Sequence, residues 1–336
     1  MMGENAQCRH WSATRRAARS EAGFTVIELL VAVALGLVVL AGLFRTFKVQ
    51  HDSYIIQDQV SAMQQNLRAA MHFITRDLQM AGYYTNFDRN NKQMDWNDLD
   101  GDSNPTTNME TGRPLIFAVN DSSVAGDDIK DNTDVIVIVK ASTEDGRLLA
   151  SGESASAGSL TLNLPNFGLN SGTKKYGGLI KNDLSFAELF HLDNSGNITP
   201  PLTETYTPDL ATPSLSDRIH RADIIIYRVE DSTPARPCLV RKNLGSDNGY
   251  QVIAENIDNL QFRYQLNDGT WVHDPAGNQA RVRAVEILLV ARTAYPQRGY
   301  KDTNSITFGG ASIPAPNDSY RRKIISSIVK TRNIGL

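Results

Sequence analysis

Three aspartates in a polar stretch of the sequence have a spacing that could bind a metal ion. Asp98, Asp100 and Asp102 occupy alternate positions, and carboxylate oxygens are the ligands that Ca²⁺ prefers. An EF-hand loop starting at Asp98 needs glycine at its sixth position and a bidentate acid at its twelfth. The sequence has Ser103 and Met109 there, so the EF-hand pattern fails. We therefore expect a solvated acidic loop without a cofactor, and a calcium site of another geometry is the open alternative.

One further acid, Glu28, lies near the start of an apolar run that extends from Phe24 to Phe44. A charged group in a membrane-spanning helix costs about 2.5–3.5 kcal/mol at the helix centre and less near an end. Glu28 is therefore a candidate functional residue. Its natural partner is a positively charged amino terminus, which cleavage after Gly23 would create on Phe24 of the same chain or of a neighbouring one.

The sequence contains no arrangement of residues that is typical of an enzyme. The six histidines lack metal-binding spacing, and no nucleophile elbow, phosphate loop or dinucleotide-binding fingerprint occurs. The only cysteine apart from Cys8 is Cys238, whose strand-like surroundings favour a buried and unreactive thiol. The net charge of −3 gives no sign of nucleic-acid binding. We expect no catalytic residue.

The first element that positions Glu28 is a membrane-spanning helix over residues 24–44. These 21 residues would reach about 31 Å as a helix, which matches a hydrocarbon core of about 30 Å. The preceding residues 1–23 contain four arginines and two acids, and this positive charge favours a cytoplasmic leader with the rest of the chain across the membrane. Arg45 and Lys48 weaken that orientation signal. The run is longer than the apolar region of an ordinary cleavable signal.

The helical pattern continues beyond the span, and residues 24–82 are predicted to form one long helix. Apolar residues recur at intervals of three or four in its second half, which predicts one buried stripe. The stripe consists of Val60, Met63, Leu67, Met71, Ile74 and Leu78. Arg76 and Asp77 are expected on the other faces, and Gly82 is expected to end the helix.

Residues 83–336 are predicted to form a head domain dominated by strands. Segments rich in β-branched and aromatic residues predict strands at 135–139, 160–164, 224–229, 262–266, 282–290 and 324–329. Asn267-Asp268-Gly269 before Trp271 predicts a hairpin with a three-residue loop. The stretch 165–220 is rich in turn residues and is expected to be a loop-rich insertion without a core of its own.

The expected fold class is therefore α+β, with a long amino-terminal helix packed on a mainly antiparallel β-sheet head. The membrane half of the helix would be followed by an amphipathic half. Within the head, Arg321, Arg322 and Lys323 form the most basic patch. We expect solvated surface there, and docking of an acidic partner is the open alternative.

Gly23-Phe-Thr-Val-Ile-Glu28 followed by an apolar helix resembles the class III signal of type IV pilins and type II secretion pseudopilins. The resemblance implies that a prepilin peptidase cuts between Gly23 and Phe24 and that Phe24 is then N-methylated. It makes Glu28 the fifth residue of the mature chain. It also implies the type IV pilin-like fold.

Later segments resemble PilW-type minor pilins. They are residues 69–83, 132–134, 255–264, 283–292, 321–322 and 331–333. The resemblance implies a minor pilin that is incorporated in a type IV pilus or primes its assembly. The implied partners are other minor pilins, the major pilin, the prepilin peptidase, the inner-membrane assembly platform and, as a further candidate, a tip adhesin. The implied location is the inner membrane, crossed once with the head in the periplasm, and then the pilus at the cell surface.

Two alternatives stay open. Within the same superfamily, the chain could be a type II secretion pseudopilin that resembles GspJ. From a different class, it could be a periplasmic binding module whose anchor is incidental, and such a module would not be processed at Gly23.

Overall fold

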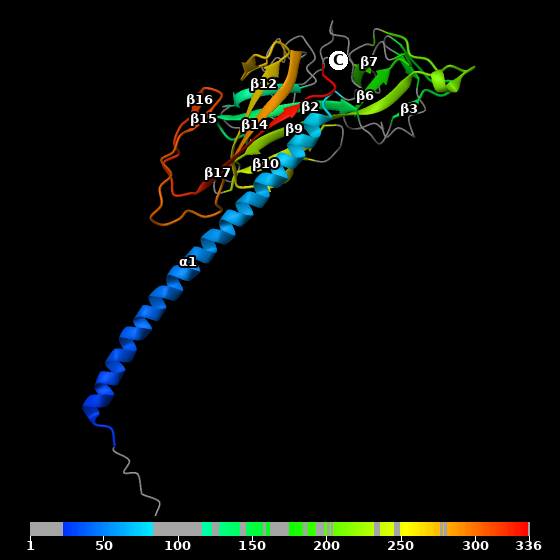
Figure 1. The fold of residues 1–336 in the computed structure, drawn as a ribbon. Coiled ribbons are helices and arrows are strands. Elements are labelled where there is room, and N and C mark those ends of the chain that lie inside the picture. The colour runs from blue at the N-terminus through cyan, green and yellow to red at the C-terminus, as the bar shows by residue number, and fades with distance from the viewer. Residues whose placement is uncertain are drawn as a thin grey trace, which may run out of the picture. The chain divides into compact units, whose positions relative to one another are not determined.

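The computed structural model contains one long helix and a set of antiparallel sheets (Figure 1). It describes residues 23–82, 116–122, 128–141, 146–156, 159–161, 175–183, 187–192, 198–199, 202, 204–231, 236–244, 249–275, 278 and 281–334. The chain divides into two compact units, Met1–Ile56 and Gln57–Leu336.

Helix α1 (Val26–Gln79) is the only helix of more than one turn in the described part of the chain. Within the first unit its side chains are exposed from Val26 to Ile55, including the aliphatic ones. By length and composition α1 can cross a membrane. The exposed apolar surface of this segment favours a lipid or helix-bundle environment over water.

The second unit begins with the amphipathic half of α1, and the predicted stripe is confirmed. Met63, Leu67, Met71, Ile74 and Leu78 are buried, and Val60 packs partly against the same core. Each fully buried aliphatic side chain contributes about 1.5–3 kcal/mol, so this face holds the helix to the head. Past the end of the helix, Gly82 adopts a φ of +74° and its N–H donates to the Val139 carbonyl at 2.9 Å. A residue without Cβ suits that backbone conformation.

The larger sheet of the second unit has nine strands, in the order β1-β2-β9-β6-β7-β8, with β10 and β3 also on β9 and with β11 on β10. All its pairings are antiparallel. The strands are β1 (Ile116–Ser122), β2 (Thr133–Ala141), β3 (Arg147–Leu148), β6 (Lys175–Ile180), β7 (Ala187–Leu192), β8 (Ile198–Thr199), β9 (Arg218–Glu230), β10 (Cys238–Asn243) and β11 (Gln251–Glu255).

A second sheet has four strands in the order β13-β12-β14-β17, again antiparallel. They are β12 (Ile257–Leu266), β13 (Trp271–Val272), β14 (Val282–Arg292) and β17 (Arg322–Lys330). Two hairpins complete the unit: β4 (Ser154–Ser156) with β5 (Ser159–Thr161), and β15 (Ile306–Phe308) with β16 (Ala311–Ile313). Both sheets and α1 contribute to one main core. The predicted α+β class is confirmed.

The predicted three-residue hairpin loop between β12 and β13 is present. Leu266 N–H donates to the Thr270 carbonyl at 2.8 Å, and Gly269 N–H donates to the Leu266 carbonyl at 3.0 Å. Gly269 has a φ of +88°, the left-handed conformation that the third loop position needs.

The prediction for residues 165–220 is wrong, because part of this stretch forms sheet and a separate core. Strands β6, β7 and β8 join the larger sheet here. A cluster of buried residues lies beside them, consisting of Leu149, Ala155, Leu179, Phe190, Leu202, Tyr206 and Ile219. Gly177 and Gly178 lie against the Phe190 and His220 rings, where a Cβ would come within 2.4 Å and 2.2 Å of a ring carbon. These two glycines, which we interpreted as turn residues, instead allow the strand backbone to pack closely against the two rings.

Candidate assembly site

The bond between Gly23 and Phe24 lies immediately before the start of α1. Both residues are exposed and non-helical, and 86% of the Phe24 surface is accessible. A peptidase needs an exposed peptide bond outside regular secondary structure. The predicted scissile bond is thus accessible, although its cleavage stays a prediction.

Thr25 and Glu28 form a capping box at the start of the helix. The Thr25 hydroxyl oxygen accepts from Glu28 N–H at 3.3 Å, and the Glu28 carboxylate accepts from Thr25 N–H at 3.5 Å. The Thr25 hydroxyl also donates to that carboxylate at 3.4 Å. This reciprocal arrangement satisfies two N–H groups that a helix start leaves without intrahelical partners. The distances are at the long end of the hydrogen-bond range, so breaking the hydrogen bonds of the capping box costs little free energy.

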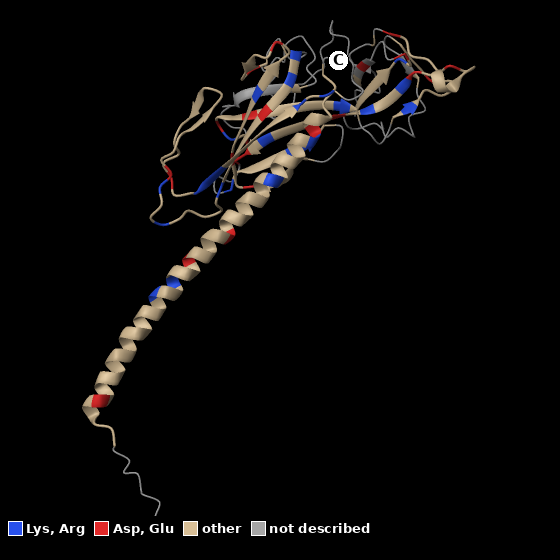
Figure 2. Ribbon diagram, viewed as in Figure 1, with Lys and Arg blue, Asp and Glu red and all other residues tan. Residues whose placement is uncertain are grey.

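Glu28 is the only charged residue between Phe24 and Phe44. Figure 2 shows α1 with one acidic position near its start, followed by several turns without charge. Within the described residues, Glu28 forms no salt bridge, and its polar contacts are those to Thr25. Among the residues that the structure describes, no cation is paired with this carboxylate.

At the other end of the helix, Asp77 is completely buried and joins α1 to the larger sheet. Its carboxylate accepts from the Tyr227 hydroxyl at 2.6 Å and pairs with Lys140 at 3.1 Å and with Arg241 Nε at 3.0 Å. These partners lie on β9, β2 and β10. The sequence predicted Asp77 on a face other than the buried stripe, but the residue is buried, because two cations and a phenol at the sheet surface offset its desolvation. We call Asp77, Lys140, Tyr227 and Arg241 the Asp77 lock.

Electrostatics in the Asp77 lock favour the ionised carboxylate. Burial alone would raise the pKa of Asp77, but the hydrogen bond from Tyr227 and the charges of Lys140 and Arg241 hold this pKa below its ordinary value. Burial and the neighbouring carboxylate raise the pKa of the Tyr227 hydroxyl. At neutral pH the lock therefore contains an anion, two cations and a neutral phenol, and it fixes α1 to the sheet in one register.

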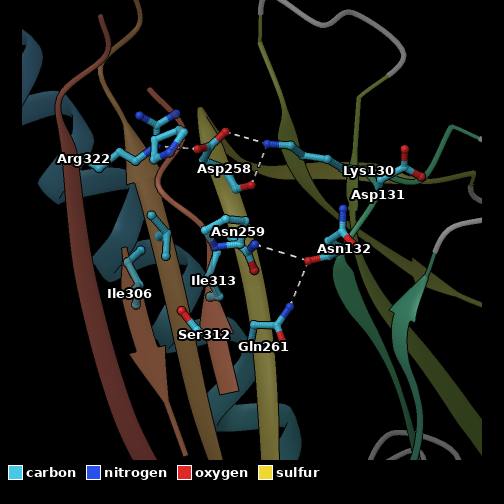
Figure 3. Close-up of a pocket in the computed structure, with 13 residues that line it drawn as sticks. Lys130, Asp131, Asn132, Asp258, Asn259, Gln261, Ile306, Ser312, Ile313 and Arg322 are labelled. Atoms are coloured by element: carbon cyan, nitrogen blue, oxygen red, sulfur yellow. Dashed lines mark hydrogen bonds and ion pairs between the residues drawn. The ribbon is translucent and has the colours of Figure 1, made fainter. Parts of the chain in front are cut away.

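A cleft of about 440 Å³ lies in the second unit between β12, the segment before β2 and the β15–β16 hairpin (Figure 3). The Asn132 carbonyl bridges its walls, since it accepts from Asn259 at 3.3 Å and from Gln261 at 3.0 Å. Val290, Ile306 and Ile313 also line the cleft. The lining thus combines amide groups with an aliphatic surface.

Ion pairs close one end of this cleft. Asp258 binds Lys130 at 2.6 Å and Arg322 Nε at 2.6 Å, and Arg322 also pairs with Asp318 at 2.6 Å and with Asp302 at 3.3 Å. Burial alone would raise the pKa of Asp258, but the charges of Lys130 and Arg322 lower it. These charges compensate one another and join both sheets to the loop before β17.

The basic patch at 321–323 is therefore only partly the solvated surface that we expected. The Arg322 side chain is 8% exposed within the cluster around Asp258. Arg321 stacks over the Tyr300 ring at 4.6 Å and donates to the Gln297 side chain. Only Lys323 is exposed. Acids around Arg322, both near and distant in the sequence, and the ring and amide that contact Arg321 account for the difference.

The calcium candidates Asp98, Asp100 and Asp102 lie outside the described residues. Among residues that the structure describes, no group of three or more His, Cys, Asp or Glu side chains is placed to hold a metal ion. Cys238 is half-buried on β10, where its thiol donates to the Arg236 carbonyl at 3.3 Å, so the expected burial is only partial. Burial raises the pKa of the Cys238 thiol, which disfavours the reactive thiolate.

Comparisons with known proteins match both ends of the chain. Residues 18–44 match the prokaryotic N-terminal methylation motif, and residues 226–333 match the family of type IV pilus-assembly protein W, PilW. Among solved structures, a type IV-like pilin from Thermus thermophilus is similar at 12% identity and a TM-score of 0.34, covering 81% of this chain and 97% of its own. No curated protein sequence matches the chain.

The methylation motif at the start of a long apolar helix, together with the antiparallel head, defines the class of type IV pilins. Within that class the chain is PilW-like, since the matched region begins in β9 and extends past β17. These two matches point to a structural protein rather than an enzyme, and they fit membrane anchoring through α1.

Proposed function

We propose that the chain is a minor pilin, cut between Gly23 and Phe24 by a prepilin peptidase and methylated on Phe24. The processed subunit then enters a type IV pilus or the complex that primes its assembly. The observation that carries the proposal is the exposed apolar half of α1, with one acid in its first turn, directly behind an accessible peptide bond. Its head would lie in the periplasm before assembly.

Cleavage would change the electrostatics of the helix start. Hydrolysis of the Gly23–Phe24 bond leaves a carboxylate on the released leader and a new amine, protonated at neutral pH, on Phe24. A positive amine close to Glu28 neutralises the one charge in the apolar segment. When the amine belongs to a neighbouring subunit, the same pairing sets the axial register between two helices as they leave the bilayer.

The proposed partners follow from this mechanism. The peptidase recognises the segment around Gly23, the major and other minor pilins pack against the exposed face from Val26 to Ile55, and the inner-membrane platform delivers the subunit. A tip adhesin would contact the head. A type II secretion pseudopilin that resembles GspJ is the alternative, and the PilW match favours the pilus.

The test of processing is the intact mass of the protein purified from cells with and without the prepilin peptidase. We expect a product that begins at Phe24 and carries one added methyl group when the peptidase is present, and an uncut chain when it is absent. An uncut chain in both strains would refute the proposal and favour an anchored binding module.

The test of assembly is Glu28→Ala, with Asp52→Ala as the matched control. Asp52 is an exposed acid on the same helix, outside the apolar run. We expect both variants to be cut, but only Glu28→Ala to be lost from sheared pili, by about tenfold or more if a partly desolvated ion pair is broken. Equal incorporation of both variants would contradict the role of Glu28.

A further inference from the structure

Strand β17 forms an unpaired edge of the four-stranded sheet. It bonds to β14 along one side, from Arg322 opposite Arg292 to Lys330 opposite Ala284, without a shift in register. On its other side no strand of the described chain pairs with it. At about 3.3 Å per residue, its nine residues present roughly 30 Å of edge with free N–H and C=O groups.

Apart from the lysines near its ends, this edge lacks the features that usually block further pairing. Proteins protect sheet edges with prolines, bulges or a covering element, and β17 contains no proline and no bulge. The edge strand β11 of the larger sheet is different. Its pairing with β10 has a register shift, and Asn66 of α1 donates to its Glu255 carbonyl at 2.9 Å. The helix therefore covers part of one edge and leaves β17 uncovered.

The outer face of β17 carries two exposed isoleucines with Ser326 between them. Ile324 and Ile328 lie on the same face of the strand and are 45% and 58% exposed. On β14, the neighbouring Leu288 and Val290 are buried beneath Phe308 of the β15–β16 hairpin. The hairpin covers β14 but not the two isoleucines of β17, which leaves an aliphatic strip along the open edge.

Cations lie at both ends of β17, with Lys330 on the face of the two isoleucines and Lys323 on the opposite face. Lys323 is at one end, and Lys330 and Arg332 are at the other; all three are exposed, and the structure gives none of them an ion pair within the described residues. Arg322, by contrast, is neutralised by Asp258 and Asp318. The edge is thus locally positive, although the chain as a whole has a net charge of −3.

We propose that β17 binds an extended segment of a partner protein as an added β-strand. Main-chain hydrogen bonds would supply affinity, and side chains would supply selectivity. The segment that fits has aliphatic residues at its centre, against Ile324 and Ile328, and acidic residues at both ends, against Lys323 and Lys330. This surface is separate from the proposed processing and helix-packing sites, so its test does not depend on them.

The experiment uses the purified full-length chain in detergent micelles and synthetic nonapeptides as probes. The first probe has alternating valine and threonine at its centre and two acids at each end. The second carries lysines in place of the acids, and the third is the first probe with a central proline. We expect the first to bind and the other two to bind at least about tenfold more weakly. Hydrogen exchange should show new protection in β17 only with the first probe.

Two variants of the edge have matched controls elsewhere in the head. Ile328→Lys places a charge on the aliphatic strip, and Lys330→Glu reverses one end charge. Their controls are Leu210→Lys, at a 71% exposed position, and Lys301→Glu, at an exposed lysine. We expect each edge variant to weaken binding of the first probe by about fivefold or more, while the controls bind as the parent chain does.

Three outcomes would overturn the proposal. They are equal binding of the acidic and lysine peptides, protection that appears outside β17, and no binding at millimolar peptide. Self-association of the parent chain that Ile328→Lys abolishes would overturn it as well, because the occupant would then be a second copy. The exchange measurement uses the unsubstituted chain, so the test stands even if a variant folds poorly.

Discussion

Replacing Asp77 by alanine should separate α1 from the larger sheet more than any other single change on the helix. The substitution leaves the Lys140 and Arg241 charges, whose side chains are 14% and 18% exposed, without their anion. It also removes the acceptor of the Tyr227 hydroxyl. Breaking a buried ion pair by removing one partner costs about 3–5 kcal/mol. We therefore expect a loss of that size in the free energy of unfolding.

The same reasoning predicts a pH dependence. Because the pKa of Asp77 is lowered in the folded chain, its ionised form stabilises the fold above the pKa of the unfolded state, about 3.9. That stabilisation is lost as the pH falls through the folded pKa. The stability difference between the parent chain and Asp77→Ala should thus be constant near neutral pH and shrink below about pH 4.

The assay is urea unfolding of the full-length chain in detergent, followed by near-ultraviolet circular dichroism at several pH values. Asp52→Ala is the control, because Asp52 is exposed on the same helix and should change the unfolding free energy by less than about 0.5 kcal/mol. A loss below about 1 kcal/mol for Asp77→Ala, or a loss that grows in acid, would refute the assignment of the lock.

Two further changes probe packing and charge in the head. Gly178→Ala would place a Cβ 2.2 Å from His220 Cε1, so we expect a loss of about 1–3 kcal/mol in unfolding free energy; Gly146→Ala, whose Cβ would lie 3.8 Å from His220 Cβ, should be tolerated, and equal effects would contradict the packing argument. Asp258→Ala removes the anion shared by Lys130 and Arg322 and should lower the unfolding free energy by about 2–3 kcal/mol. This is less than the roughly 3–5 kcal/mol expected for a buried pair that loses its only anion, because Arg322 keeps Asp318. Asp268→Ala breaks an exposed pair with Arg281, and a comparable loss there would count against the role of burial.

Local patterns in the sequence predicted the elements whose stability is local. The spacing from Val60 to Leu78 identified the buried face of α1, and Asn267-Asp268-Gly269 identified its hairpin, because side-chain periodicity and glycine conformation act over a few residues. The processing motif around Glu28 was equally visible, since a single acid in an apolar run needs no tertiary structure to stand out.

The sequence did not reveal buried charge. Arg322 was assigned to solvent, and Asp77 to a helix face other than the buried stripe. Asp77 is instead paired with Lys140, Tyr227 and Arg241, which are at least 63 residues away in the sequence. Arg322 is paired with Asp258, which is 64 residues away. One signal was available: Asp77 follows Ile74 by three residues and adjoins Leu78, which places it beside the buried stripe. Strand β1 was also missed. The strands within 165–220 were missed because Gly177 and Gly178 pack against rings instead of marking turns.

The position of the Asp77 lock, two residues before the end of α1, has a mechanical consequence. Within the second unit, a force applied to α1 at its Gln57 end loads the contacts of the stripe from Met63 to Leu78 in shear. The contacts closest to Gln57 are aliphatic and have no fixed geometry. The ion pairs of Asp77 lie at the opposite end of the stripe and are loaded only after the aliphatic contacts have shifted. Resistance to extraction of the helix is then governed by the rate at which the whole stripe and the lock fail together. The charged contacts that hold α1 to the head thus lie near the carboxyl-terminal end of the helix.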